Sequence, residues 1–119
     1  MDEKLRAMLE EAGFEVEETF LRFLKKEDFY KKYLFGFPED RIFPQLSQAM
    51  EKGDMEAAEK LVHTLKGTTG NLGITPLHQD CKSLLDAIRN GEEKDVITAK
   101  YQKARETYDE ITRFIISIR

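Results

Sequence analysis

The stretch from His63 to Gly73, HTLKGTTGNLG, places a histidine three residues before a lysine inside a strongly amphipathic pattern. Imidazole is a side chain that is commonly uncharged near neutral pH and can then act as a nucleophile without a partnered base. Phosphoryl transfer also needs positive charge near the equatorial oxygens, which Lys66 would supply from one helical turn away. The residue types at His63 and Lys66 therefore suit phosphoryl transfer.

Two glycines, Gly67 and Gly70, follow the histidine at spacings of four and seven residues. Each glycine in a helix interior costs about 1 kcal/mol relative to alanine. Residues at these spacings share the surface patch of His63, and without side chains they let another protein approach the imidazole. We therefore expect Gly67 and Gly70 to be partner-docking positions.

The direction of the histidine follows from the helical rotation of about 100° per residue. His63 falls on the side opposite the apolar stripe and is expected to face solvent rather than the core. The stripe that we expect to be buried consists of Ala58, Leu61, Leu65, Thr68 and Leu72.

Apolar residues recur at spacings of three and four, and glycine and proline are sparse, which indicates an all-α fold. We expect an antiparallel up-down bundle of four main helices with additional short N-terminal helices, in a single domain of residues 1–119. The pattern predicts helical segments at about 2–12, 16–34, 43–52, 55–71, 75–89 and 97–118.

Several helix ends have recognisable signals. Gly13 is a predicted stop for the first helix, and Asp54 is a predicted N-cap whose carboxylate accepts free amide hydrogens of the next turn. Thr75 and Pro76 predict another start, with a capping hydroxyl followed by a proline in the first turn. Gly91 is expected to end that helix.

Composition excludes several classes of function. The chain of 119 residues has 19 basic and 23 acidic residues and a formal charge of -4, which argues against nucleic-acid binding. No apolar run approaches the roughly 20 residues that span a membrane, and no signal peptide is recognisable. The single cysteine, Cys81, lies on an apolar stripe and is expected to be a buried hydrophobe. We expect a cytoplasmic protein.

The run from His63 to Gly67, closed by Leu72 and Gly73, resembles the signature of the histidine-containing phosphotransfer (HPt) domains of phosphorelays. The resemblance implies that His63 accepts a phosphoryl group, that Lys66 supports it, and that Gly67 and Gly70 keep the docking face low. It implies a carrier without kinase activity or a cofactor of its own.

The same resemblance implies that the partners are response-regulator receiver domains, a hybrid sensor histidine kinase, or both. The receiver would supply the phosphorylated aspartate and a bound magnesium ion. The chain itself is expected to be a monomer. The alternative, from a different class, is a helical-bundle adaptor that binds signalling partners without becoming phosphorylated.

One position departs from the family pattern. Where several relatives place a polar side chain that holds the histidine ring, this chain has Leu85. Ring orientation would then depend on Gln79, Ser83, a backbone carbonyl or water. His78, the second histidine, is expected to be a surface or capping residue.

Overall fold

The computed structural model describes residues 1–119 and contains helices but no strands, so the all-α prediction is confirmed. None of the helices has the length and apolar character needed to cross a membrane. The elements are α1 (Glu3–Glu11), α2 (Val16–Arg22), α3 (Glu27–Gly36), the 3-10 turn η1 (Phe37–Glu39), α4 (Ile42–Lys52), α5 (Met55–Asn71), α6 (Thr75–Arg89) and α7 (Lys94–Ile118).

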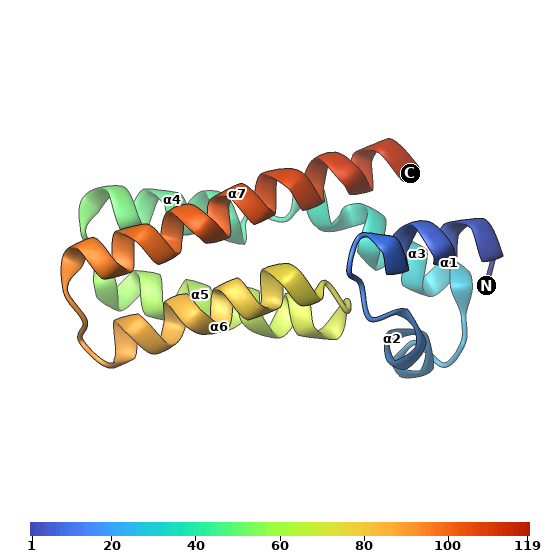
Figure 1. The fold of residues 1–119 in the computed structure, drawn as a ribbon, viewed down its shortest axis with the longest axis horizontal. Helices are drawn as coiled ribbons and strands as arrows, with labels where there is room; N and C mark the ends of the chain where they lie inside the picture. Colours follow the sequence, from blue (N-terminus) through green and yellow to red (C-terminus); the bar gives the residue numbers. More distant parts are fainter.

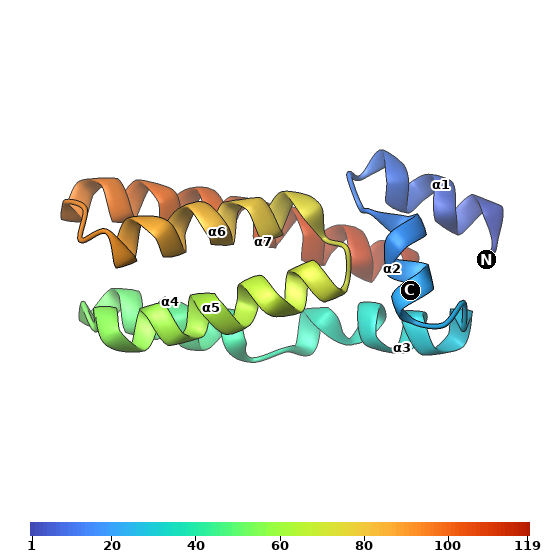
Figure 2. The same cartoon turned by 90° about the horizontal axis from the view of Figure 1, so that it is seen from below.

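Four helices form the body of the molecule. In Figure 1, α4, α5, α6 and α7 lie along the long axis, and each runs opposite to the helix before it. The short helices α1, α2 and α3 gather at one end, beside the turn between α5 and α6. Figure 2 shows α3 almost in line with α4, and the molecule measures 44 × 23 × 21 Å.

Aromatic side chains join the first and last helices of the bundle. The ring of Phe43 on α4 stacks on Tyr108 of α7 with centroids 4.1 Å apart, and on Tyr101 at 6.1 Å. The Tyr101 hydroxyl donates a hydrogen bond of 2.8 Å to Ser47 Oγ on α4. These contacts pack the α4–α7 side of the bundle.

Helix ends follow the predicted signals with one exception. Asp54 Oδ1 accepts a hydrogen bond of 3.1 Å from the Ala57 amide, as expected of an N-cap. The predicted cap at Thr75 is wrong, because Ile74 occupies the N-cap position and no side chain caps α6. Since Thr75 is already the first helical residue, its hydroxyl does not reach the free amides; its contact is with Gly73 O at 3.5 Å.

The segment predicted as one helix over 16–34 is divided into α2 and α3. Leu24 and Lys25 between them have φ values of 58° and 57°, in the left-handed region. The Lys25 amide donates to Phe20 O at 2.9 Å, which satisfies a carbonyl at the end of α2. Because neither residue is glycine or proline, the sequence contains no helix-breaking signal at this position.

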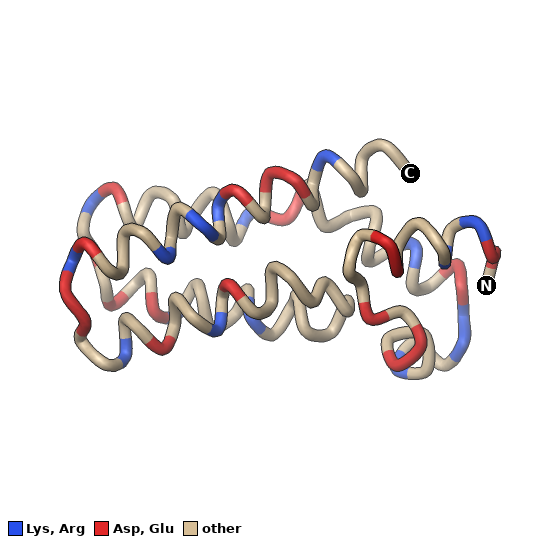
Figure 3. The backbone as a smooth tube through the Cα atoms, viewed as in Figure 1, with Lys and Arg blue, Asp and Glu red and all other residues tan.

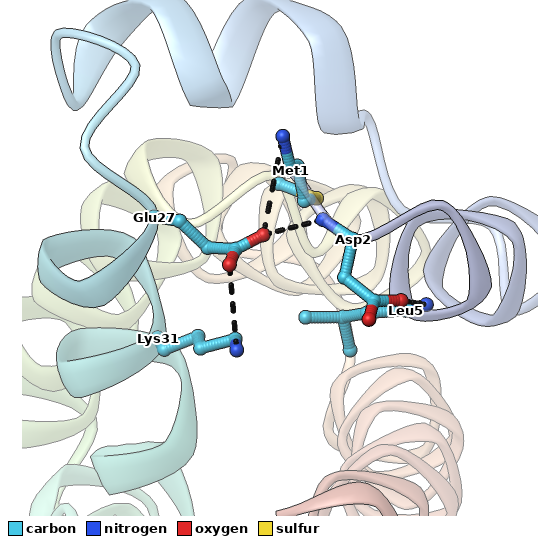
Figure 4. Close-up of polar contacts among 5 residues, drawn as sticks. All are labelled: Met1, Asp2, Leu5, Glu27 and Lys31. Atoms are coloured by element: carbon cyan, nitrogen blue, oxygen red, sulfur yellow. Dashed lines mark hydrogen bonds and ion pairs between the residues drawn. The ribbon is translucent and has the colours of Figure 1, made fainter.

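Polar contacts fasten the start of the chain to α3 (Figure 4). Glu27 Oε1 accepts a hydrogen bond of 2.6 Å from the Asp2 amide, and that bond lowers the pKa of Glu27. Lys31 lies 3.6 Å from the other carboxylate oxygen. Asp2 in turn caps α1 by accepting from the Leu5 amide at 2.9 Å, which lowers the pKa of Asp2. Asp2 therefore caps the N-terminus of α1 with its side chain and joins it to α3 with its backbone amide.

Candidate functional site

Helix α5 carries the candidate site, and its buried stripe differs slightly from the predicted one. Leu61 and Thr68 are only half-buried, whereas Val62 and Thr69 are completely buried. The stripe is rotated because α4 and α6 both pack against α5, so that its core side faces the line between them. The buried residues of α5 and its C-cap are Ala58, Val62, Leu65, Thr69 and Leu72.

His63 lies on the opposite side of α5, where the periodicity places it, and is exposed. Its ring makes no hydrogen bond with another residue of the chain. One turn further along α5, Gly67 is also exposed, and a Cβ added there would have no heavy atom within 4 Å. The surface next to the imidazole is therefore open.

A surface hollow of about 340 Å³ contains every residue that the sequence singled out for chemistry or docking. The α5 residues lining it include His63 and Lys66, and one side chain, His78, comes from α6. Lys66 is half-buried and lines the hollow together with His63. The full lining is His63, Lys66, Gly67, Gly70, Asn71 and His78.

Gly70 differs from the expectation of a bare docking position, because His78 occupies the space above it. A Cβ added at Gly70 would lie 3.1 Å from both Cε1 and Nδ1 of the His78 ring. His78 Nδ1 is 2.8 Å from the carbonyl oxygen of Lys66. A carbonyl can only accept, so Nδ1 carries the hydrogen and donates it. At Gly70 the missing side chain makes room for another residue of the same chain.

The C-terminal end of α5 is bound by the N-terminal segment. Arg22 Nη2 on α2 donates to Gly70 O at 2.9 Å, and it lies 3.5 Å from Asn71 O. The last carbonyls of a helix lack intrahelical partners and carry partial negative charge, so a guanidinium is favourable there. The Glu15 amide also donates to Gly73 O at 2.8 Å, which docks α2 on the turn after α5.

The side chains of α6 considered as holders of the His63 ring do not serve that purpose. Leu85 is completely buried in the core. Ser83 Oγ accepts a hydrogen bond of 2.8 Å from Lys100 and thus faces α7. Gln79 is exposed, is not part of the hollow and forms no hydrogen bond within the chain. None of these α6 side chains therefore holds the imidazole through a hydrogen bond.

The stretch of chain that forms the end of α5 and the start of α6 carries no charge after Lys66. Residues 67–79 include no Lys, Arg, Asp or Glu, and Figure 3 shows the ends of α5 and α6 near their connection without either colour. Among the residues that line the hollow, Lys66 is the one with a charged side chain, and its positive charge favours binding of a phosphoryl group. The structure contains no group of three or more histidine, cysteine or acidic residues that could hold a metal ion.

Two residues at this site were not assigned to it from the sequence. His78 lies fifteen positions after His63, and its approach to Lys66 depends on how α6 folds back over α5. Arg22 lies far from the motif and has no pattern that connects it to the end of α5. A weak signal was present at Gly70, because a glycine in a helix interior can mark a close contact with another element.

The comparison with protein families agrees with this geometry. The sequence model of the Hpt domain matches residues 39–111, which include α4, α5, α6 and most of α7. No curated protein and no solved structure matches the chain significantly. Since the matched region covers more than half of the chain and contains the hollow, the chain belongs to the Hpt domain family.

Proposed function

We propose that this chain is a phosphorelay intermediate in which His63 accepts a phosphoryl group from a receiver-domain aspartate and passes it to another receiver. Membership in the Hpt domain family supports a phosphotransfer role in two-component signalling. The observation that carries the assignment to His63 is its exposed, unpaired imidazole in a hollow with Lys66.

The proposed step exchanges one phosphorus bond for another. A ring nitrogen of His63 attacks the phosphorus of the aspartyl phosphate, a P–N bond forms, and the P–O bond to the aspartate breaks. The leaving group is the aspartate carboxylate, and the ring keeps its other N–H hydrogen. Lys66 would offset negative charge on the equatorial oxygens, while magnesium would be held by the receiver.

An apolar groove next to the hollow supports a protein partner. It has a volume of about 580 Å³ and is lined partly by Phe23, Phe29 and Tyr33 of the N-terminal segment. Asn71 borders both the groove and the hollow, so the two adjoin at this residue. Phe29 and Tyr33 pack on each other with ring centroids 5.1 Å apart, yet they remain 44% and 48% exposed, and such an exposed apolar cluster is typical of a protein-binding surface. We assign this groove to the receiver that docks over His63.

The direct test is transfer of label from a phosphorylated receiver domain to the purified chain. We expect an acid-labile, alkali-stable phosphohistidine that is absent in His63→Gln. The chain has two histidines, so His78→Gln is the matched control and should still become labelled. Label that persists in His63→Gln, or that disappears only in His78→Gln, would refute the assignment.

A second measurement separates the relay from the adaptor alternative. Lys66→Ala should slow transfer with little change in the free energy of unfolding, because its ammonium acts on the phosphoryl group. An adaptor would instead bind receivers equally well with and without His63 and would carry no transferable phosphate. Binding without any labelling of the wild-type chain would thus favour the adaptor.

A further inference from the structure

The turn of α5 between Lys66 and Gly70 is intrinsically weak but is fastened by side chains. Two glycines lower its helix propensity, by about 1 kcal/mol each. In an α-helix the Lys66 carbonyl pairs with the Gly70 amide, so this turn contains both glycines. Thr69 Oγ1 approaches the carbonyls of Leu65 and Lys66 at 2.9 and 3.1 Å from within the helix.

His78 supplies the corresponding contact from outside the helix. Its Nδ1 donates to Lys66 O at 2.8 Å, and its ring lies over Gly70 at the distance that only a residue without Cβ accommodates easily. His78 is also the α6 side chain in the hollow that contains His63. The residue that would stabilise the phosphoryl group is therefore held, through its own carbonyl, by a second histidine.

We propose that His78 is a positioning residue for phosphotransfer, which fixes the Lys66 turn beside His63 by donating from Nδ1 to the Lys66 carbonyl. This role rests on the proposed function. His78 does not need to touch the phosphoryl group, since its ring sits over Gly70, about 10 Å of helix rise from His63. The same geometry explains why Gly70 has no side chain.

Other charged groups near His78 do not replace this contact. The second hollow beside its ring is lined by Glu15, Glu18 and Arg22 of the N-terminal segment. Arg22 is committed to Gly70 O and Thr19 Oγ1, and neither glutamate side chain forms a hydrogen bond or ion pair with His78. The side chain of His78 forms one hydrogen bond within the chain, and its partner is the Lys66 carbonyl.

Two conservative variants distinguish the roles of the two ring nitrogens of His78. In His78→Asn, the amide nitrogen can take the place of Nδ1 and keep the donor, while Nε2 is lost. In His78→Gln, a polar atom can take the place of Nε2, while the donor at Nδ1 is lost. His78→Ala removes both, and Gln79→Ala is the matched control, because Gln79 is exposed on the same helix and outside the hollow.

The experiment measures transfer from a phosphorylated receiver under single-turnover conditions, with the receiver concentration varied. We expect the limiting rate of His78→Ala and His78→Gln to fall about two- to tenfold, the range for the net contribution of one hydrogen bond. His78→Asn should recover the wild-type rate. The receiver concentration at half-maximal rate should not change, which distinguishes positioning from docking. Urea unfolding of each variant identifies general destabilisation.

A double variant tests whether His78 acts through Lys66. In a Lys66→Ala background, His78→Ala should have little further effect on the limiting rate, because the group that it positions is gone. The role would be overturned if the effects of Lys66→Ala and His78→Ala on the limiting rate were fully additive. It would also be overturned if His78→Ala and His78→Gln both kept the wild-type rate, or if His78→Asn were as slow as His78→Ala. Failure of the wild-type chain to accept phosphate would overturn the proposed function itself, and with it this role.

Discussion

The exposed face of α5 has two parts that differ in how they are covered. At Gly67 an added Cβ would meet no heavy atom within 4 Å, and the exposed imidazole of His63 has no hydrogen-bond partner within the chain. On the Gly70 side, by contrast, the Lys66 carbonyl accepts a hydrogen bond from His78 of α6, and the Gly70 carbonyl accepts one from Arg22 of α2. The same helix thus has an open surface at His63 and Gly67 and a turn at Lys66 and Gly70 that other helices contact.

The two glycines of the motif illustrate the difference. Gly67 leaves space that nothing fills, which suits the approach of a partner. Gly70 leaves space that His78 fills, which suits the fastening of the turn. The same residue type at neighbouring positions on one helix face therefore serves access in one case and internal packing in the other. Substitutions along this face should separate the two parts.

The fastened end should tolerate substitution least, and Gly73→Ala should have the largest effect. Gly73 has φ of 71°, and a Cβ there would lie 2.1 Å from Thr19 Oγ1 and 2.5 Å from Glu15 O. We expect a loss of roughly 2–5 kcal/mol in the free energy of unfolding, measured in urea. Gly53→Ala is the matched control, because Gly53 has φ of 70° but open space around it. It should lose only about 1–2 kcal/mol, and equal losses would show that packing of α2 on the turn is unimportant.

Gly70→Leu should impair transfer more than it impairs folding. Its Cβ would meet the His78 ring at 3.1 Å and displace the ring from the Lys66 carbonyl, while the longer side chain fills the hollow. We expect transfer to slow about tenfold or more, since misplacement of about 1 Å can cost up to roughly 100-fold. The measurement is the single-turnover rate from a phosphorylated receiver. A rate equal to that of the wild type would mean that neither the hollow nor the His78 contact is needed.

Gly67→Ala should change stability in the opposite direction. An added Cβ meets no atom within 4 Å, and alanine has the higher helix propensity. We expect the free energy of unfolding to rise by up to about 1 kcal/mol, with the His78 contact unchanged. Urea unfolding measures the gain. Destabilisation at this position would contradict the description of this part of α5 as open.

The reactivity of the Cys81 thiol shows whether the substitutions on α5 and α6 leave the core of the bundle intact. It is completely buried on α6, and burial raises its pKa to about 12. The thiol should therefore resist alkylation at pH 8 in the wild type, in Gly67→Ala and in His78→Ala alike. Its contribution to stability is complete below about pH 9, the ordinary thiol value, and should be lost as the pH rises toward 12. Rapid labelling in a variant would show that the core of the bundle has opened.

Features encoded within a few residues were predictable. The helix stop at Gly13, the N-cap at Asp54 and the outward direction of His63 follow from local conformational preference and from the helical period. The turn at Leu24 and Lys25 was not predictable, because non-glycine residues adopt a conformation there that local preference disfavours. The cap expected at Thr75 failed because the chain enters α6 one residue earlier than the capping pattern requires.

The sequence by itself determined an all-helical chain with an imidazole, a lysine and two glycines on one outward patch, since short-range periodicity specifies which side chains share a face. Only the tertiary structure decided that His78 lies over Gly70, that Arg22 binds the end of α5, and that Leu85 points into the core. Those contacts depend on how helices distant in the chain cross one another. That crossing is set by the packing of the whole core, which no local pattern contains.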